Sequence, residues 1–273
     1  MNKFYGEVII GPPGSGKSTY CNGRKQFLLC FGVRAIIINL DPGNENLPYD
    51  CDINISKLIK MKELMENDDL GPNGTIVKAY EYISKNYMWV IDNILPFMNE
   101  KVYFLFDLPG QIELVTHYDY THNIFDHLTK NLNIHLCVVN LIECTCACDS
   151  TRFIQSCITS LICMLRLSLP QVNVMSKSDL LLKISHKLSF KIDYYTDVLN
   201  MSYLIDEIQS RNTKFKKLNK GICAVIENSS LVSFMLLDVE NKELMLKLGL
   251  EIAKAIGNYT LYNHDVRNLV HTI

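Results

Sequence analysis

The residues best suited to chemistry in this chain form a glycine-rich run near its start, Gly11-Pro12-Pro13-Gly14-Ser15-Gly16-Lys17-Ser18-Thr19. The run fits the phosphate-binding pattern Gly-x4-Gly-Lys-Ser. Glycine allows positive φ and close approach to a phosphate, so that successive N–H groups form a nest for an anion. We expect Lys17 to reach the β and γ phosphates of a nucleotide, and Ser18 to hold Mg²⁺ through its hydroxyl.

The neighbouring segments favour this interpretation over a glycine-rich turn that carries a lysine by chance. Residues 7–10 are apolar enough for a short buried strand, and residues 19–31 place apolar side chains at helical spacing. A helix at this point directs the positive end of its dipole at the bound phosphates. The sequence therefore predicts a strand, a phosphate-binding loop and a helix in succession.

Two aspartates follow predicted strands and are candidates for the metal site. Asp41 ends a β-branched strand at 35–40, where it is a candidate for the metal shell or for positioning water; a turn aspartate is the alternative. Asp107 ends the apolar strand at 102–106 and is followed by Gly110 and Gln111. We expect Asp107 to serve Mg²⁺, the Gly110 amide to bond the γ-phosphate, and Gln111 to orient the attacking water. The alternatives are a strand-end turn and a surface glutamine.

A third set of residues selects the base. A strand at 170–175 runs into Ser176-Lys177-Ser178-Asp179. The carboxylate of Asp179 can accept hydrogen bonds from N1–H and N2–H of guanine, and adenine lacks this pair of donors. With the wrong base a buried carboxylate stays unpaired, which is a strong source of discrimination. We also expect the Lys177 stem to lie over the base and Ser233 to stand in the last base-facing loop.

The elements that position these residues predict a single α/β domain over residues 1–273. We expect a three-layer α/β/α fold with a mainly parallel sheet, because the strands are continuously apolar and alternate with helices. A helical insertion occupies 43–100, with one helix from Asn54 to Glu66, a loop at 67–74 and a second helix at 75–98. A helix is expected at 150–167, a helical lid at about 183–220, and strands at 222–226 and 232–237.

Composition restricts the classes of function. The chain has 273 residues, a net charge of −2 and no basic tract of domain size, which argues against direct nucleic-acid binding. Its apolar runs are too short to span a bilayer. The ten cysteines with no signal peptide favour a reduced, cytoplasmic protein. Cys144, Cys146 and Cys148 alternate instead of following a zinc-binding spacing, so incidental thiols are the simpler reading.

Residues Gly71-Pro72-Asn73, between the Asp41 and Asp107 strands, resemble the signature of the GPN-loop GTPases. The resemblance extends over nearly the whole chain to about Asn258 and is greatest to the eukaryotic GPN-loop GTPase 2 branch. It rests on the glycine-rich run and on these further strings: Asn39-Leu40-Asp41-Pro42, Leu47-Pro48-Tyr49, Gly110-Gln111-Ile112-Glu113-Leu114, Ser176-Lys177-Ser178-Asp179, Asp193-Tyr194-Tyr195-Thr196 and Leu231-Val232-Ser233-Phe234.

The resemblance implies a GTP-hydrolysing molecular switch that dimerises across the nucleotide, with itself or with a sister GPN protein. Asp41, Asp107, Gln111 and Glu113 would then serve magnesium and water. Asn73 of one subunit would reach the active site of the other. Such help has a physical reason, because no obvious arginine stands next to a predicted catalytic motif in the sequence. Members act in cytoplasmic assembly and nuclear import of RNA polymerase II, so polymerase subunits or assembly factors are the implied partners.

Departures from the family pattern are small. Gly43 replaces the usual Ala, Leu108 replaces Thr or Cys, and Ser176 replaces Asn as in many relatives. The first two changes remove no polar group that the chemistry needs, and beside Ser176 the guanine-reading Asp179 remains. Two other classes of function remain open: a GTP-binding scaffold with little turnover, and a P-loop ATPase or small-molecule kinase.

Overall fold

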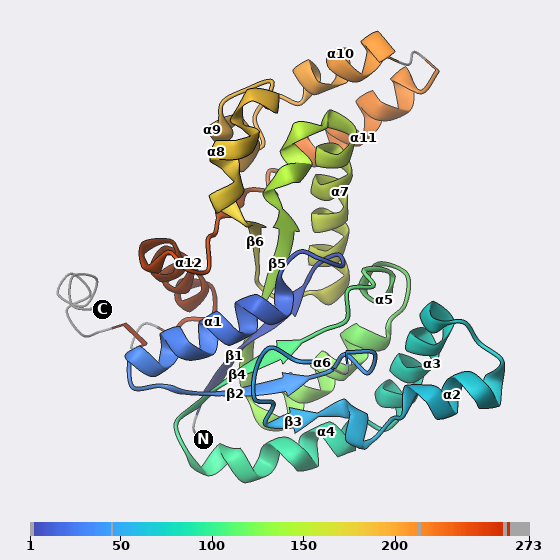
Figure 1. The fold of residues 1–273 in the computed structure, drawn as a ribbon, viewed down its shortest axis with the longest axis vertical. Coiled ribbons are helices and arrows are strands. Elements are labelled where there is room, and N and C mark those ends of the chain that lie inside the picture. Colours follow the sequence, from blue (N-terminus) through green and yellow to red (C-terminus); the bar gives the residue numbers. More distant parts are fainter. Residues whose placement is uncertain (1–2, 45, 212–213, 259–260, 263–273) are drawn as a thin grey trace.

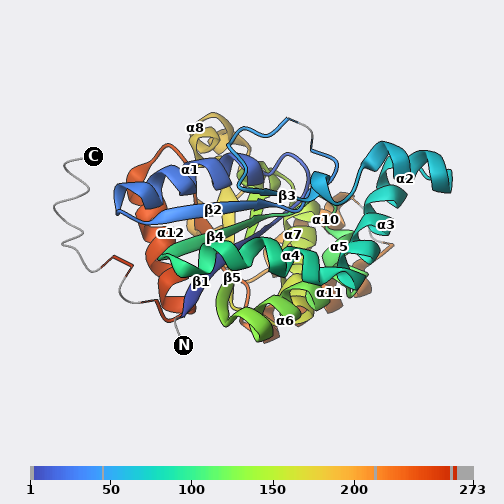
Figure 2. The same ribbon diagram turned by 90° about the horizontal axis from the view of Figure 1, so that it is seen from below.

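The computed structural model describes residues 3–44, 46–211, 214–258 and 261–262. Its centre is a seven-stranded sheet, in the order β3-β2-β4-β1-β5-β6-β7, in which every neighbouring pair is parallel. Helices flank the sheet on both faces (Figures 1 and 2), which confirms the predicted three-layer α/β fold. The strands are β1 Phe4–Ile10, β2 Arg34–Asn39, β3 Ile53–Asn54, β4 Val102–Asp107, β5 Ile134–Glu143, β6 Gln171–Ser176 and β7 Phe234–Leu236.

The strands are mainly apolar because both faces of the sheet are buried. Successive side chains point to opposite faces, so that Ile9 and Val8 of β1 enter different cores. One core lies under α1 (Lys17–Cys30) and α12 (Lys242–Ala255). The other lies under α6 (Tyr120–Leu132), with the end of α7 (Ser150–Leu167) beside it. Few charged side chains are buried among the described residues, and two of them, Glu7 of β1 and Arg24 of α1, pair with each other.

The helical insertion is divided more finely than the sequence indicated. Asn54 caps a 3-10 turn, its side chain accepting from the Ser56 amide, and the helix predicted to start there begins seven residues later. The predicted 67–74 loop is shorter because the next helix starts at Pro72, and the predicted 75–98 helix breaks at Asn86. The elements are η1 Ile55–Lys57, α2 Met61–Asp68, α3 Pro72–Lys85, α4 Tyr87–Ile94 and η2 Leu95–Asn99.

The segment after β6 is helical, and it extends beyond the carboxyl ends of β5 and β6 (Figure 1). Helices α10 and α11 pack against α7. The strand predicted at 222–226 is wrong, since these residues lie inside α11, where Cys223 and Ile226 face the core. The helices are α8 Leu181–Ile184, α9 Ile192–Thr196, α10 Ser202–Arg211 and α11 Lys216–Ser229. In the described part of the chain, no helix has the length and apolar character needed to cross a bilayer.

Candidate nucleotide-binding site

The glycine-rich run forms a tight loop between β1 and α1. Gly11, Gly14 and Gly16 have φ values of 146°, 78° and 91°, in the region that disfavours other residues. A Cβ on Gly11 would lie 2.2 Å from the Leu141 carbonyl oxygen, so glycine is also required by close packing against β5. Helix α1 starts at Lys17 without a side-chain cap, which leaves its first amides available to an anion.

Lys17 is held over this loop. Its ammonium donates to the carbonyl oxygens of Gly11 and Pro12, at 3.0 and 3.1 Å. Burial lowers the pKa of Lys17, while the carboxylates of Asp107 and Asp41 oppose that shift. The lysine therefore lies within electrostatic reach of both predicted metal-site aspartates, as expected if the three residues belong to one site.

Asp107 is the last residue of β4 and is only 1% exposed. Burial raises its pKa, while the hydroxyls of Tyr49 and Ser18 and the charge of Lys17 lower it. The Tyr49 hydroxyl donates to Oδ2 at 2.7 Å, whereas Oδ1 is buried and has no hydrogen-bond partner among the described residues. A buried carboxylate oxygen without a partner beside a serine hydroxyl and a lysine is suited to a hydrated divalent cation.

Asp41 follows β2 in a turn that its neighbours hold in place. The buried Asn39 side chain accepts from the Asp41 amide at 3.0 Å and donates to its carbonyl oxygen at 3.2 Å. The Asp41 carboxylate accepts from the Gly43 amide at 2.9 Å. Burial raises the pKa of Asp41, opposed by the Gly43 hydrogen bond and by Lys17. Asp41 is therefore a turn aspartate, which was the alternative interpretation, and it also lies near Lys17.

The turn after Asp107 packs against the phosphate-binding loop. A Cβ on Gly110 would lie 3.0 Å from both Cα and N of Pro13, so this close contact favours glycine. The Gln111 side-chain amide donates to the side-chain oxygen Oδ1 of Asn73 at 2.7 Å. Asn73 lies in the first turn of α3, so the Gly71-Pro72-Asn73 segment meets Gln111 within the same chain. Glu113 opens the short helix α5 (Glu113–Thr116) with its side chain exposed.

The predicted base-recognition residues lie on the α1 side of the loop. The Ser176 hydroxyl donates to the Ser15 carbonyl oxygen at 2.7 Å, which ties the end of β6 directly to the phosphate-binding loop. A pocket of about 240 Å³ opens beside this bond. Its lining includes Gly16, Thr19, Lys177, Asp179 and residues 237–240.

Ser233 does not lie in this pocket, and the prediction for it is wrong. It precedes β7, whose first residue pairs with Asn173 near the start of β6, so Ser233 stands at the amino end of the strand. The pocket lies at the carboxyl end, where Leu237 and Asp238 follow β7. Sequence reasoning also gave no role to Tyr49, because its contact with Asp107 joins residues 58 positions apart.

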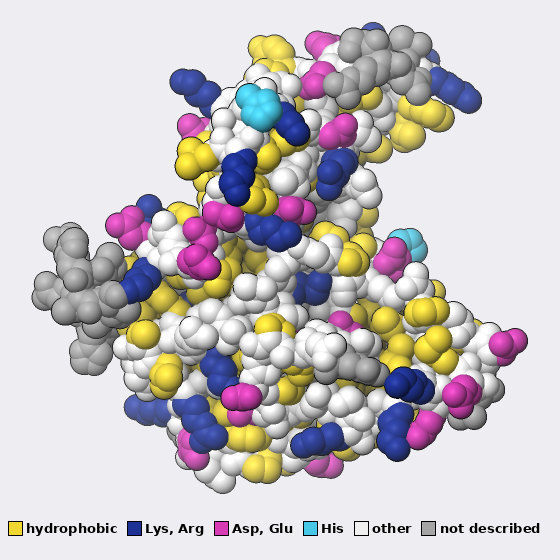
Figure 3. Space-filling view, viewed as in Figure 1, with side chains coloured by type: hydrophobic (Ala, Val, Ile, Leu, Met, Phe, Trp, Pro, Cys, Tyr) yellow, Lys and Arg dark blue, Asp and Glu magenta, His cyan; other side chains and the backbone are white. Residues whose placement is uncertain are grey.

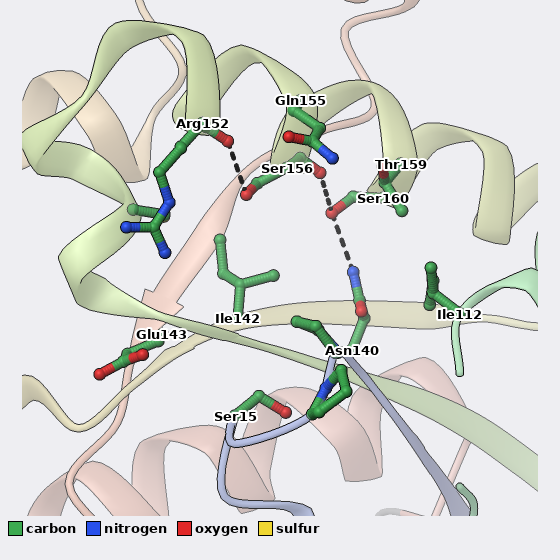
Figure 4. A pocket seen from close by; sticks show the side chains of 13 residues that line it. Ser15, Ile112, Asn140, Ile142, Glu143, Arg152, Gln155, Ser156, Thr159 and Ser160 are labelled. Carbon is green, nitrogen blue, oxygen red and sulfur yellow. Dashed lines mark hydrogen bonds between the residues drawn. The ribbon is translucent and has the colours of Figure 1, made fainter. Parts of the chain in front are cut away.

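A second cavity, of about 290 Å³, lies between the phosphate-binding loop and α7. Figure 4 shows Arg152 and Gln155 projecting from α7 on one side, and Glu143 at the end of β5 on the other. Among the described residues, Arg152 forms no ion pair. Cys144–Cys148 form the 3-10 turn η3 beside this cavity, and in the described part of the chain no three His, Cys, Asp or Glu are grouped to hold a metal ion.

Charges of both signs are interspersed on the face shown in Figure 3. Lysines and arginines lie among acidic residues and apolar side chains there, without forming a continuous basic field. The mixture of signs on this face agrees with the small net charge of −2.

The parallel sheet, the glycine-rich loop with its lysine, and the aspartate ending β4 define a P-loop nucleotide-binding protein. A family model described as "Conserved hypothetical ATP binding protein" matches residues 9–258. The chain is 45% identical to GPN-loop GTPase QQT1 of Arabidopsis thaliana over 93% of this chain and 85% of that one. It is 43% identical to GPN-loop GTPase 2 of Danio rerio over 97% of this chain and 84% of that one.

The fold also matches a solved structure, that of a GTPase in apo form from Pyrococcus abyssi. The TM-score is 0.74 with 21% sequence identity, over 92% of this chain and 97% of that one, which supports the fold. The chain therefore belongs to the GPN-loop GTPase family. This confirms the resemblance drawn from the motifs, and the segment at 71–73 is the loop that names the family.

Proposed function

We propose that this protein binds and hydrolyses GTP with Mg²⁺ and acts as a switch. The observation that carries the proposal is the meeting of three groups at one edge of the sheet. Lys17 lies within electrostatic reach of Asp107, and Ser176 joins the base-recognition loop to the phosphate-binding loop at 2.7 Å. The residues that we propose for phosphate, metal and base recognition therefore lie close together.

The residues present fit a magnesium ion. Ser18 would bind it through its hydroxyl, and Asp107 would accept from its water through the unpartnered Oδ1. When bound, the ion neutralises negative charge that develops on the phosphate oxygens. The raised pKa of Asp107 gives this site an acid limit, because the carboxylate must be ionised to hold the cation.

The chain supplies its own groups for positioning water. Gln111 would orient the attacking water, with Asp41 and Glu113 serving water and metal. Asn73 fixes the Gln111 amide in this structure, so that the GPN loop and the predicted water-positioning residue form one unit. Action of Asn73 in the site of a second subunit stays a prediction. Such action would place the Asn73–Gln111 pair between the active sites of the two subunits.

Guanine is the base that the pocket favours. Asp179 and Lys177 line it together, and a carboxylate can accept from both N1–H and N2–H of guanine. The family model is described as ATP-binding, whereas the two named relatives are GTPases. The pocket chemistry supports the second assignment for this chain.

The cellular role we propose follows from family membership. The switch would act in the cytoplasm and shuttle to the nucleus, and would assist assembly and nuclear import of RNA polymerase II, as the resemblance implies. Its partners would be a second copy or a sister GPN-loop GTPase, together with polymerase subunits or assembly factors. The helices at 183–220 would serve as the lid over the nucleotide side.

The proposal is tested by comparing GTP and ATP hydrolysis by the purified protein, with its mass in solution recorded in the presence of a non-hydrolysable GTP analogue. GTP-selective turnover by a dimer is the expected result. Tight GTP binding without turnover would support the scaffold alternative or a missing sister subunit. Preference for ATP would overturn the role given to Asp179 and favour the ATPase or kinase alternative.

A further inference from the structure

The loop that carries Lys177 and Asp179 contains a strained residue. Lys177 adopts φ 58° and ψ 42°, the left-handed region that lysine rarely enters. Such a conformation persists only where the surroundings fix it. Ser178 and Asp179 start the 3-10 turn η4 (Ser178–Leu180) directly afterwards, so the direction of Asp179 depends on this turn of the backbone.

Several contacts fix the loop, and two of the side chains that make them, Cys144 and Glu143, have no role in the family motifs. Ser176 bonds the Ser15 carbonyl oxygen, and the Ser178 amide donates to the Leu237 carbonyl oxygen at 3.0 Å. In addition, the Cys144 thiol donates to the Lys177 carbonyl oxygen at 3.0 Å. The Glu143 carboxylate lies 3.4 Å from the Lys177 ammonium.

We propose that Cys144 and Glu143 are positioning residues for guanine recognition, an inference that rests on the proposed function. Cys144 holds the peptide that turns the chain toward Asp179, and so acts on the hydrogen bonds that read guanine. Glu143 holds the ammonium of Lys177, and so directs the lysine stem that lies over the base. The first of the three alternating cysteines is thus part of the nucleotide site.

The environment of Cys144 supports a donor role and argues against a reactive thiol. The side chain is fully buried, and burial is the main cause that raises its pKa to about 12. The thiol therefore stays protonated at neutral pH and keeps its hydrogen for the Lys177 carbonyl. The charge of Asp179 contributes to the same pKa shift, which shows that the two side chains are within electrostatic reach.

The test compares Cys144→Ala with Cys144→Ser by titrating GDP and inosine diphosphate, which lacks the 2-amino group. Loss of one hydrogen bond is expected to weaken GDP binding about fivefold. Inosine diphosphate makes only one of the two hydrogen bonds to Asp179 and should lose half of the binding free energy that GDP loses. Half of that free energy corresponds to the square root of fivefold, so its binding should weaken about twofold. The preference for GDP then falls about twofold, and Cys144→Ser, which keeps a donor, restores it.

Glu143→Gln gives a different pattern, because the lysine stem covers any purine. GDP and inosine diphosphate should both weaken about twofold, in the range of partly exposed ion pairs, with their ratio unchanged. Cys163→Ala is the matched control: Cys163 is also fully buried, but it lies in the core shared with α6 and contacts none of the base-recognition residues. It should leave the nucleotide ratio at the wild-type value.

An unchanged GDP-to-inosine ratio in Cys144→Ala overturns the role of Cys144, and so does a ratio that falls equally in Cys163→Ala. An equal loss of the GDP preference in Cys144→Ala and Cys144→Ser would show that packing, and not the thiol hydrogen bond, is responsible, and would also overturn the role of Cys144. Wild-type GDP binding in Glu143→Gln overturns the role of Glu143. Failure of the proposed function itself gives a separate result, because the wild-type protein would then show no preference for GDP over ADP.

Discussion

Replacement of Glu7 by Gln tests how the fold holds the phosphate-binding loop between β1 and α1. Glu7 and Arg24 are both fully buried, with Oε1 of the glutamate 2.8 Å from Nη2 of the arginine. The Glu7 carboxylate also accepts from the hydroxyls of Tyr20 and Tyr103, at 2.6 and 2.9 Å. Glutamine keeps the shape of the side chain but leaves the guanidinium as an uncompensated buried charge.

Breaking a buried ion pair in this way costs about 3–5 kcal/mol of the free energy of unfolding. For a chain of this size each kcal/mol lowers Tm by roughly 2 °C, so differential scanning calorimetry should show a fall of about 6–10 °C. Arg34 and Glu100 offer the matched control, since they pair at 2.6 Å with side chains 54% and 57% exposed. Glu100→Gln should cost less than about 1 kcal/mol.

Equal shifts in Glu7→Gln and Glu100→Gln would refute the reasoning, because burial would then make no difference to the pair. A second substitution separates charge from packing. Adding Arg24→Met to Glu7→Gln removes the remaining charge, and an apolar replacement of a buried pair is often neutral. The double variant should therefore regain part of the lost Tm. No recovery would mean that packing, and not charge, accounts for the loss.

Three further predictions concern the site. Gly110→Ala places a Cβ 3.0 Å from Pro13 and should displace the amide that we expect to bond the γ-phosphate, so single-turnover GTP hydrolysis should fall by up to about a hundredfold. Burial raises the pKa of Asp107, so its ionised form costs folding free energy above that pKa. Asp107→Asn should raise the Tm of the nucleotide-free protein at pH 7, an advantage that shrinks on acidification, while Mg²⁺ no longer tightens GTP binding. Asn73→Ala should slow hydrolysis with GDP affinity nearly intact; unchanged turnover would remove its role.

The sheet and its three motifs could be predicted because they are local in sequence. Each motif follows an apolar strand, and the carboxyl ends of parallel strands meet at one edge of a sheet. The helix expected at 150–167 has these bounds in the structure, where Asp149 caps it by accepting from the Arg152 amide. Periodicity and capping are both visible in the sequence there.

Errors arose where one short pattern fits two structures. Residues 222–226 form an apolar run that suits a buried strand as well as the inner face of a helix, and packing against α7 selects the helix. Ser233 was misplaced for a related reason. A strand was expected at 232–237, but its direction relative to β6 is a tertiary property, and that direction decides which end meets the nucleotide.

The contacts that unite the site are those that no local pattern contains. Gly11 packs on the Leu141 carbonyl, Gly110 on Pro13, and the Ser15 carbonyl accepts from Ser176. Each contact joins the phosphate-binding loop to a different strand end, and each uses the backbone of that loop. Because small residues make these approaches possible, the base-recognition loop and the turn at Gly110 are both in direct contact with the phosphate-binding loop. We therefore expect changes at the base-recognition loop and at Gly110 to act on the same phosphate-binding loop.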